Sequence, residues 1–216
     1  FLDYAKEKEE TEGLSEYFIG RKIPKSMIDR GFDIPTLQNF EVGYDEFEKR
    51  ITMPCRYPIG GKLFGILFRQ KPKKFWATES FNKDNFIYNF APTPIRIYVE
   101  GQTDTWKVWQ NGTKYVSSTL SANPSEGQLE IMSVHKEIWL AYDNDEAGYR
   151  GAFTVNKALG RNVAIYMIPF RGKDPDTCTK DEWNWAVKNR TTFTEFEVAM
   201  ITKNPDLYER ITKKRY

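Results

Sequence analysis

The sequence predicts an α/β fold, α+β overall, in three parts: a mixed α+β amino-terminal subdomain, a subdomain with a compact parallel sheet flanked by helices, and a helical tail. Two observations predict it. Strand-like and helix-like segments alternate after residue 93, which is typical of a parallel sheet with helices on both sides. Residues 40–90 instead contain several short strand-like runs.

The order of the elements follows from hydrophobic periodicity and helix-breaking residues. Residues 1–12 are highly charged and predict a helical lead-in or linker, and residues 13–32 predict short helices with Ser15 as a cap and Gly31 as a stop. Prolines at 92 and 94 mark a hinge. We therefore expect three subdomains, at 1–92, 93–190 and 191–216.

The central subdomain is expected to hold seven elements: strand 95–100, helix 104–112, strand 113–119, strand 137–143, helix 146–159, strand 162–169 and helix 180–189. Gly148 and Gly151 near the start of the 146–159 helix would let it pack closely against the sheet, at some cost in helix propensity. The tail reads as one or two helices, broken near Asn204 and Pro205.

Acidic residues follow three of the predicted strands. They occur in YVEGQTD at 98–104, in WLAYDNDEAG at 139–148 and in GKDPD at 172–176. A parallel sheet brings the ends of such strands to one edge. The sequence therefore predicts one acidic cluster, made of Glu100, Asp104, Asp143, Asp145, Asp174 and Asp176.

Carboxylates crowded together repel one another unless protons or hard divalent cations neutralise them. Mg²⁺ suits oxygen ligands of this kind, and a pair of ions can stabilise both the attacking and the leaving oxygen of a phosphoryl transfer. Asp143 and Asp145 would point the same way if they ended an extended strand. Asp-Asn-Asp is also good turn chemistry, but three acidic segments, each after a strand, favour the metal site.

At these residues the sequence resembles the TOPRIM fold and, more narrowly, the bacterial and phage DNA primases of the DnaG type. The family carries Glu-Gly with an Asp four residues after the Glu, then Asp-x-Asp-x-Ala-Gly, then Asp-Pro-Asp. Here these motifs are Glu100-Gly101 with Asp104, Asp143 to Gly148, and Asp174-Pro175-Asp176. The Ala-Gly and the Asp-Pro-Asp make the primase resemblance more specific than Glu and DxD alone.

The resemblance spans about residues 14–190 and extends to basic segments upstream. Arg50 and Arg69 flank two strands in the way the family's arginines do, and Lys74 and Lys83 stand in places where the family has lysines. From Lys49 to Lys74 there are eight basic residues and no acidic one, which favours a surface that contacts nucleic acid or nucleotides over a plain solvated face.

The resemblance implies a DNA primase catalytic core that makes short RNA primers from ribonucleoside triphosphates on single-stranded DNA during replication. It implies that Glu100, Asp143 and Asp145 are catalytic and that all six acidic residues hold Mg²⁺ or Mn²⁺, with two or more ions. Arg50, Arg69, Lys74 and Lys83 would steer template, primer or nucleotide. Glu100 is either a general base or a metal ligand, and Asp104 is either part of the site or the N-cap of its helix.

The chain departs from the family in its cysteines. It has two, Cys55 and Cys178, with one histidine and no CxxC pair, so we expect no zinc site in this chain. The family's zinc-binding module, and a replicative helicase as partner, are expected outside it. After the second strand the family usually turns through a glycine, whereas this chain continues as SSTLSANPSEG.

Composition fits an enzyme of the cytoplasm, either of a bacterium or of a phage-infected host. Hydrophobic residues make up 40% and charged residues 29%, with a net charge of +2. No apolar run approaches the roughly 20 residues that span a membrane. His135, Cys55 and Cys178 are expected to be packing or surface residues rather than ligands or nucleophiles.

Two alternatives remain at this point. A metal-dependent nuclease or topoisomerase-like phosphodiesterase would use the same acidic cluster, although no residue marks the nucleophilic tyrosine of a topoisomerase. A non-catalytic single-stranded DNA-binding module would gain nothing from six uncompensated carboxylates. Metal-dependent chemistry separates these hypotheses.

Overall fold

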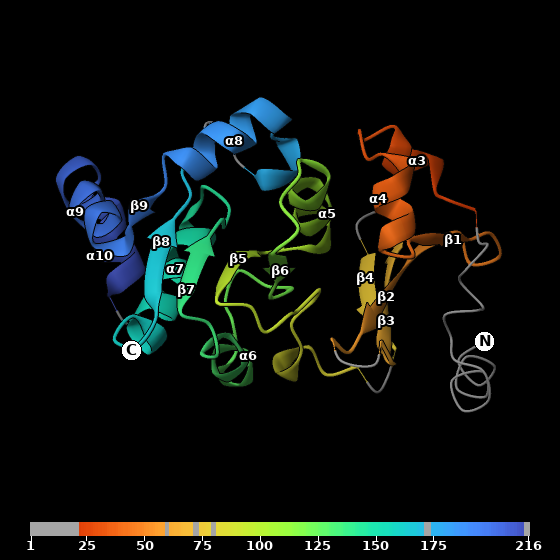
Figure 1. Ribbon diagram of the computed structural model, residues 1–216, viewed down its shortest axis with the longest axis horizontal. Coiled ribbons are helices and arrows are strands. Elements are labelled where there is room, and N and C mark those ends of the chain that lie inside the picture. Colours follow the sequence, from red (N-terminus) through yellow and green to blue (C-terminus); the bar gives the residue numbers. More distant parts are fainter. Residues whose placement is uncertain (1–21, 59–60, 71–73, 79–80, 171–173, 214–216) are drawn as a thin grey trace. The chain divides into compact units, whose positions relative to one another are not determined.

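The computed structural model describes residues 22–58, 61–70, 74–78, 81–170 and 174–213. The predictions for residues 1–12, for Ser15 and for the lysines at 71 and 73 lie outside the described residues. The chain divides into two compact units between Asn82 and Lys83, and each is described here by itself (Figure 1).

The first unit combines two short helices with one antiparallel sheet. The helices are α3 (Lys25–Ile28) and α4 (Ile34–Asn39), and the strands, in sheet order, are β1 (Gly43–Asp45), β2 (Arg50–Arg56), β3 (Leu63–Gln70) and β4 (Lys74–Ala77). Asp33 caps α4 by accepting a hydrogen bond from the Thr36 N–H at 2.8 Å. Gly31, the expected stop, follows α3 with φ of 87°, a conformation that glycine adopts easily.

The second unit is built on a five-stranded sheet. Its strands, in sheet order, are β6 (Val116–Ser118), β5 (Ile95–Val99), β7 (Glu137–Leu140), β8 (Ala164–Met167) and β9 (Thr191–Thr192). The first four are parallel, as expected, and β9 is added antiparallel at the edge beside β8. Its helices are η1 (Lys83–Asn85), α5 (Gln102–Gln110), α6 (Glu126–Met132), α7 (Glu146–Leu159), η2 (Pro175–Thr177), α8 (Lys180–Lys188), α9 (Phe193–Lys203) and α10 (Pro205–Thr212).

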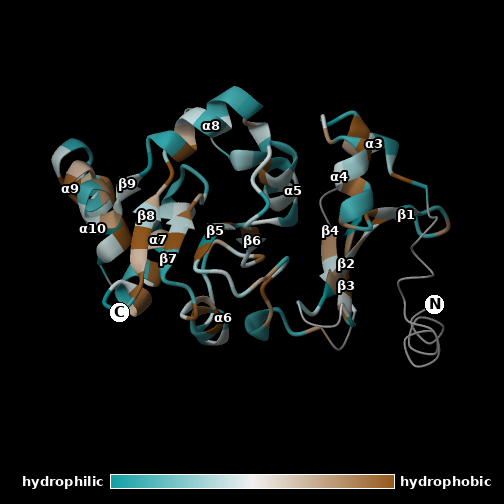
Figure 2. Cartoon of the chain, viewed as in Figure 1, coloured by the Kyte–Doolittle hydropathy of each residue, from teal (hydrophilic) through white to brown (hydrophobic). Residues whose placement is uncertain are grey.

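Helices cover both faces of this sheet, as the alternating pattern predicted. On one face Ile97 and Trp139 pack with Val108 of α5 and Trp183 of α8. On the other face the buried core includes Tyr98, Leu140, Met132 of α6 and Val155 of α7. Figure 2 shows that β7 and β8, which these helices cover, are largely hydrophobic, whereas much of α8 is hydrophilic.

The helix α6 was not predicted from the sequence, and it lies between the strands expected at 113–119 and 137–143, where no element was assigned. Ser125 caps this helix through the Gln128 N–H at 3.1 Å, and the Gln128 side chain accepts from the Ser125 N–H at 3.0 Å. This is a capping box, and its Ser-x-x-Gln spacing was the available signal.

The carboxyl-terminal helices pack against α7. Phe153 of α7 contacts Phe193 and Phe196 of α9 and Tyr208 of α10. The break between α9 and α10 falls at Asn204, next to Pro205, as expected. Among the described residues, no helix has the length and apolar character required to cross a membrane.

Candidate active site

The three acidic motifs follow three adjacent parallel strands. Glu100 comes directly after β5, Asp143 lies three residues beyond the end of β7, and Asp174 comes after β8. Because β5, β7 and β8 are parallel neighbours, these residues reach the same edge of the sheet, as the sequence predicted.

A hydrogen bond joins the first two motifs. The Glu100 carboxylate accepts the Asp143 backbone N–H through Oε1 at 3.0 Å, which leaves Oε2 outside this bond. Burial raises the pKa of Glu100, and the carboxylates of Asp145 and Asp174 raise it further, although the Asp143 N–H lowers it. Glu100 is therefore held in place while remaining a better proton acceptor than an exposed glutamate.

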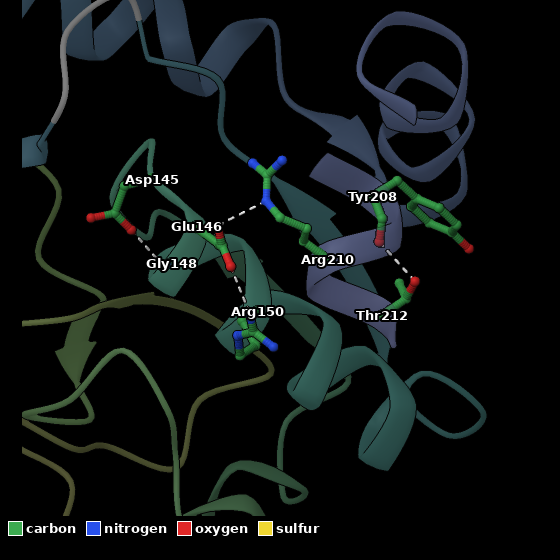
Figure 3. A network of polar contacts seen from close by, with 7 residues as sticks. All are labelled: Asp145, Glu146, Gly148, Arg150, Tyr208, Arg210 and Thr212. Atoms are coloured by element: carbon green, nitrogen blue, oxygen red, sulfur yellow. Dashed lines mark hydrogen bonds and ion pairs between the residues drawn. The ribbon is translucent and has the colours of Figure 1, made fainter. Parts of the chain in front are cut away.

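The Asp-Asn-Asp segment is a turn and not the extended strand end that we expected. β7 ends at Leu140, and the Asp145 N–H bonds to the Asp143 carbonyl at 2.8 Å. The chain has to turn here because α7 begins at Glu146. Asp145 is the N-cap of that helix, and its Oδ1 accepts the Gly148 N–H at 2.9 Å (Figure 3).

Asp143 supplies the clearest candidate ligand atom of the cluster. Its Oδ1 is buried and has no hydrogen-bond partner in the part of the chain that the structure describes. Burial raises its pKa to about 8, with further contributions from Glu100, Asp104, Asp174 and Asp145. A buried anionic oxygen without a partner is costly, and either a proton or a cation relieves that cost.

Asp104 is both a helix-terminal residue and a member of the cluster. It is the third residue of α5 and not the N-cap, because the helix begins at Gln102. Its Oδ2 accepts the Gly101 N–H at 2.9 Å. Burial raises its pKa to about 7, and the carboxylates of Asp176, Glu100 and Asp174 add to this. All six predicted acidic residues thus belong to one mutually repelling group.

The donor set fits a hard divalent cation that shares its ligands with substrate and water. In the described part of the chain, no three His, Cys, Asp or Glu side chains gather closely enough to hold an ion by themselves. Mg²⁺ commonly needs only one or two carboxylates, since waters and substrate phosphates complete its shell. The unpartnered Asp143 oxygen supplies one such ligand position.

Asn144, the middle residue of the motif, is a site residue that the sequence analysis missed. Its side-chain amide donates to the Phe170 carbonyl at 3.0 Å. Phe170 lies between β8 and Asp174, so this bond ties the second acidic motif to the segment that leads to the third. No sequence signal marks the contact, because the two residues are 26 positions apart.

A network of charges borders the turn between β7 and α7. Glu146 accepts from Arg150 at 2.7 Å within the helix and from Arg210 of α10 at 3.3 Å (Figure 3). These pairs are partly exposed, so each contributes at most about 1 kcal/mol. The pair with Arg210 connects α10 to Glu146, the residue next to Asp145. No pattern in the sequence of the tail predicted this contact.

The predicted basic residues lie on both units. Arg50, Arg69 and Lys74 are in the first unit and Lys83, which is exposed, is in the second. Arg50 is only 8% exposed, and its Nε donates to the buried Asp45 at 3.2 Å. Arg69 is partly exposed and lies 5.2 Å from the ring centre of Phe75, which is itself exposed. Arg69 thus presents a cation beside an aromatic face.

The histidine and the cysteines occupy packing positions. His135 is buried, with Nε2 2.9 Å from the Tyr98 hydroxyl and Nδ1 2.6 Å from the Thr93 carbonyl, and burial lowers its pKa. Both cysteines are buried and reduced, and burial is the main reason why the pKa of Cys178 rises to about 11. None of the three is poised for nucleophilic chemistry.

Comparison with known proteins agrees with this geometry. Residues 97–179 match the protein-family model described as Toprim-like. A DNA primase of Clostridium acetobutylicum is 26% identical over 200 residues, covering 83% of this chain and 33% of that protein. One from Myxococcus xanthus is 27% identical, covering 64% of this chain and 26% of that protein. The chain thus spans about a third or less of the length of these relatives.

Solved structures extend the likeness to the whole chain. The zinc-binding and RNA polymerase domains of the Aquifex aeolicus primase superpose with a TM-score of 0.69 at 19% identity, covering 97% of this chain and 64% of that one. The RNA polymerase domain of the Mycobacterium tuberculosis primase DnaG gives 0.67 at 16% identity, covering 88% and 86%. The resemblance to DnaG-type primases is confirmed: the chain contains a Toprim-like domain within the fold of the DnaG primase catalytic core.

Proposed function

We propose that the chain is the catalytic core of a DNA primase, a nucleotidyltransferase that makes short RNA primers from ribonucleoside triphosphates on single-stranded DNA. One observation supports this above all. Three acidic motifs at one edge of the parallel sheet surround a buried Asp143 oxygen that has no hydrogen-bond partner among the described residues.

In this proposal the acidic cluster is the polymerisation site. Asp143 and Asp145, with Asp174 and Asp176 beyond them, would hold Mg²⁺ or Mn²⁺ together with the triphosphate. The chemistry that the cation would supply there is orientation of the phosphates and stabilisation of the charge on the departing pyrophosphate. Asp104 completes the outer part of the cluster. Its buried carboxyl has a pKa of about 7 and is about half protonated at neutral pH, and a bound cation would lower that pKa.

In this proposal Glu100 is the general base that accepts the proton of the attacking 3′-hydroxyl. Its Oε1 is anchored on the Asp143 N–H, so Oε2 is the oxygen available for substrate or cation. The raised pKa favours proton transfer, since a base works best when its pKa approaches the working pH.

The basic residues and the partners complete the proposal. Arg69, with Phe75 beside it, would contact the single strand through a phosphate and a stacked base, and Lys74 and Lys83 would add positive charge. Arg50 would act more indirectly, because it is buried against Asp45. A zinc-binding module and a replicative helicase would be partners outside this chain, and the cytoplasm would be the compartment.

The test is incorporation of labelled ribonucleotides on a single-stranded template with Mg²⁺ or Mn²⁺, with strand cleavage scored in the same reactions. We expect short RNA products that disappear without metal and in Asp143→Asn. Cleavage without synthesis would assign the site to a nuclease instead. Asp206→Asn on the exposed surface of α10 removes one carboxylate away from the cluster and should leave synthesis unchanged.

A further inference from the structure

Gly148 lies where the first turn of α7 meets the other acidic motif. It is the third residue of the helix and is buried. Glycine in a helix is less stable than alanine by about 0.5–1 kcal/mol, so helix stability does not explain its presence. Its φ is outside the left-handed region, since the glycines with positive φ are others. The absence of a side chain, and not a special backbone conformation, is therefore what this position uses.

A methyl group at Gly148 has no room. A Cβ built there would overlap the Asp143 carbonyl oxygen, and it would lie 3.0 Å from the Asp143 nitrogen and 2.8 Å from Oε1 of Glu100. Real Cβ atoms essentially never approach other atoms closer than 3.0 Å, so the contacts with the carbonyl oxygen and with Oε1 exclude a methyl group. The Asp143 nitrogen and Oε1 of Glu100 are also the two atoms that form the hydrogen bond between these residues at 3.0 Å. The helix therefore packs directly on the bond that connects two acidic motifs.

The backbone of Gly148 also fixes the third carboxylate of this group. Its N–H donates to Oδ1 of Asp145 at 2.9 Å (Figure 3). Gly148 thus packs against Glu100 and Asp143 on one side and bonds Asp145 on the other. These are the three residues to which the proposed function assigns catalysis. Displacing it would disturb all three, because its N–H holds the Asp145 carboxylate while its Cα packs on the hydrogen bond between Glu100 and Asp143.

We infer that Gly148 is a positioning residue, whose missing side chain sets the spacing of Glu100, Asp143 and Asp145 for a divalent cation. The inference rests on the proposed function, because it takes these carboxylates as the site of polymerisation. It assigns Gly148 no contact with substrate.

A matched control exists one turn further along the same helix. Gly151 is also buried, and a Cβ there would overlap the Ala122 carbonyl oxygen and lie 3.2 Å from the Tyr142 ring. None of the three nearest atoms belongs to a carboxylate. Gly151→Ala therefore imposes a similar steric strain on α7 without touching the acidic residues.

The experiment titrates Mn²⁺ alone into the full chain and into both variants, at a temperature where circular dichroism shows each to be folded. We expect Gly148→Ala to weaken Mn²⁺ binding by about 10- to 100-fold, the range typical of residues that orient metal ligands. Gly151→Ala should keep the wild-type Mn²⁺ affinity even if its Tm falls as far. Binding of single-stranded DNA without metal should be unchanged in both.

Two results would overturn the inference. One is a wild-type Mn²⁺ affinity in Gly148→Ala, and the other is a loss of Mn²⁺ affinity in Gly151→Ala equal to that in Gly148→Ala.

The same titration separates the inference from the proposed function. If the wild type binds Mn²⁺ but makes no RNA, the proposed function fails while the Mn²⁺ affinities still decide the role of Gly148. A wild type that binds no Mn²⁺ overturns both. If Gly148→Ala does not fold in buffer, the titration of all three proteins is repeated in sucrose, which favours the folded state. A Gly148→Ala chain that stays unfolded there would reject the inference, because the glycine would then be required for folding itself.

Discussion

Asp104→Asn should make the metal-free protein less sensitive to pH. Asp104 is 7% exposed, and burial followed by the Asp176 carboxylate raises its pKa from 3.8 to about 7. The folded protein therefore keeps a proton that the unfolded chain releases. A raised pKa stabilises the fold at acid pH, and this contribution is lost as the pH rises through the folded value.

The size of the effect follows from linkage. Between about pH 5 and pH 6 Asp104 is protonated in the folded protein and ionised in the unfolded chain, so the free energy of unfolding falls by about 1.36 kcal/mol per pH unit. At pH 7 the folded protein has released about half of this proton. The fall between pH 5 and pH 7 is therefore about 2.3 kcal/mol in all. Asparagine does not titrate, and its amide oxygen can still accept the Gly101 N–H. Both proteins keep the neighbouring carboxylates. The contribution of Asp104 is therefore the difference between the wild type and Asp104→Asn in the slope of the free energy of unfolding against pH.

The assay is urea unfolding with EDTA at a series of pH values, for the wild type, for Asp104→Asn and for Asp206→Asn as a control for one lost charge. We expect the wild type and the control to lose stability together between pH 5 and pH 7, while Asp104→Asn loses about 2.3 kcal/mol less. Adding Mg²⁺ should flatten the wild-type curve, because the cation stabilises the ionised cluster. Parallel curves for the wild type and Asp104→Asn would refute the reasoning.

Three further predictions concern other contacts. Asn144→Ala removes the bond to the Phe170 carbonyl and should lower ribonucleotide incorporation by about 10- to 100-fold; unchanged rates would show that the third acidic motif is held without it. Asp45→Ala leaves the buried Arg50 without its carboxylate and should cost about 3–5 kcal/mol in urea unfolding, whereas a loss under about 1 kcal/mol would mean that Arg50 finds water or another partner. Arg69→Ala should weaken single-stranded DNA binding and reduce its salt dependence by about one ion, measured by fluorescence anisotropy at several salt concentrations, and an unchanged salt slope would exclude a phosphate contact.

The sequence determined most of the second unit by itself. Strands and helices alternate there with short connections, so local periodicity was sufficient to predict a parallel sheet with helices on both faces. The boundaries of α7 were predicted at 146–159, where they are observed. Acidic residues after consecutive parallel strands must meet at one edge, and for that reason the composition of the cluster was predictable before its geometry.

Tertiary structure decided how each acidic residue is used. Asp145 caps α7 by accepting the Gly148 N–H, and Asp104 in the first turn of α5 accepts the Gly101 N–H. Both bonds form because the first N–H groups of a helix have no acceptor within the helix. The bonds of Glu100 to Asp143, and of Asn144 to Phe170, join residues 43 and 26 positions apart, which no local pattern records.

The basic residues show the same limit. A run without acidic residues predicted a positive surface, but it could not reveal that Arg50 turns inward to the buried Asp45 while Arg69 lies beside the exposed Phe75. Alternation along a strand gives the face on which a side chain lies, and the packing around that face decides whether its charge meets a partner or solvent. The sequence thus carried the chemistry of the site, and the fold alone fixed the distances and pKa values on which that chemistry depends.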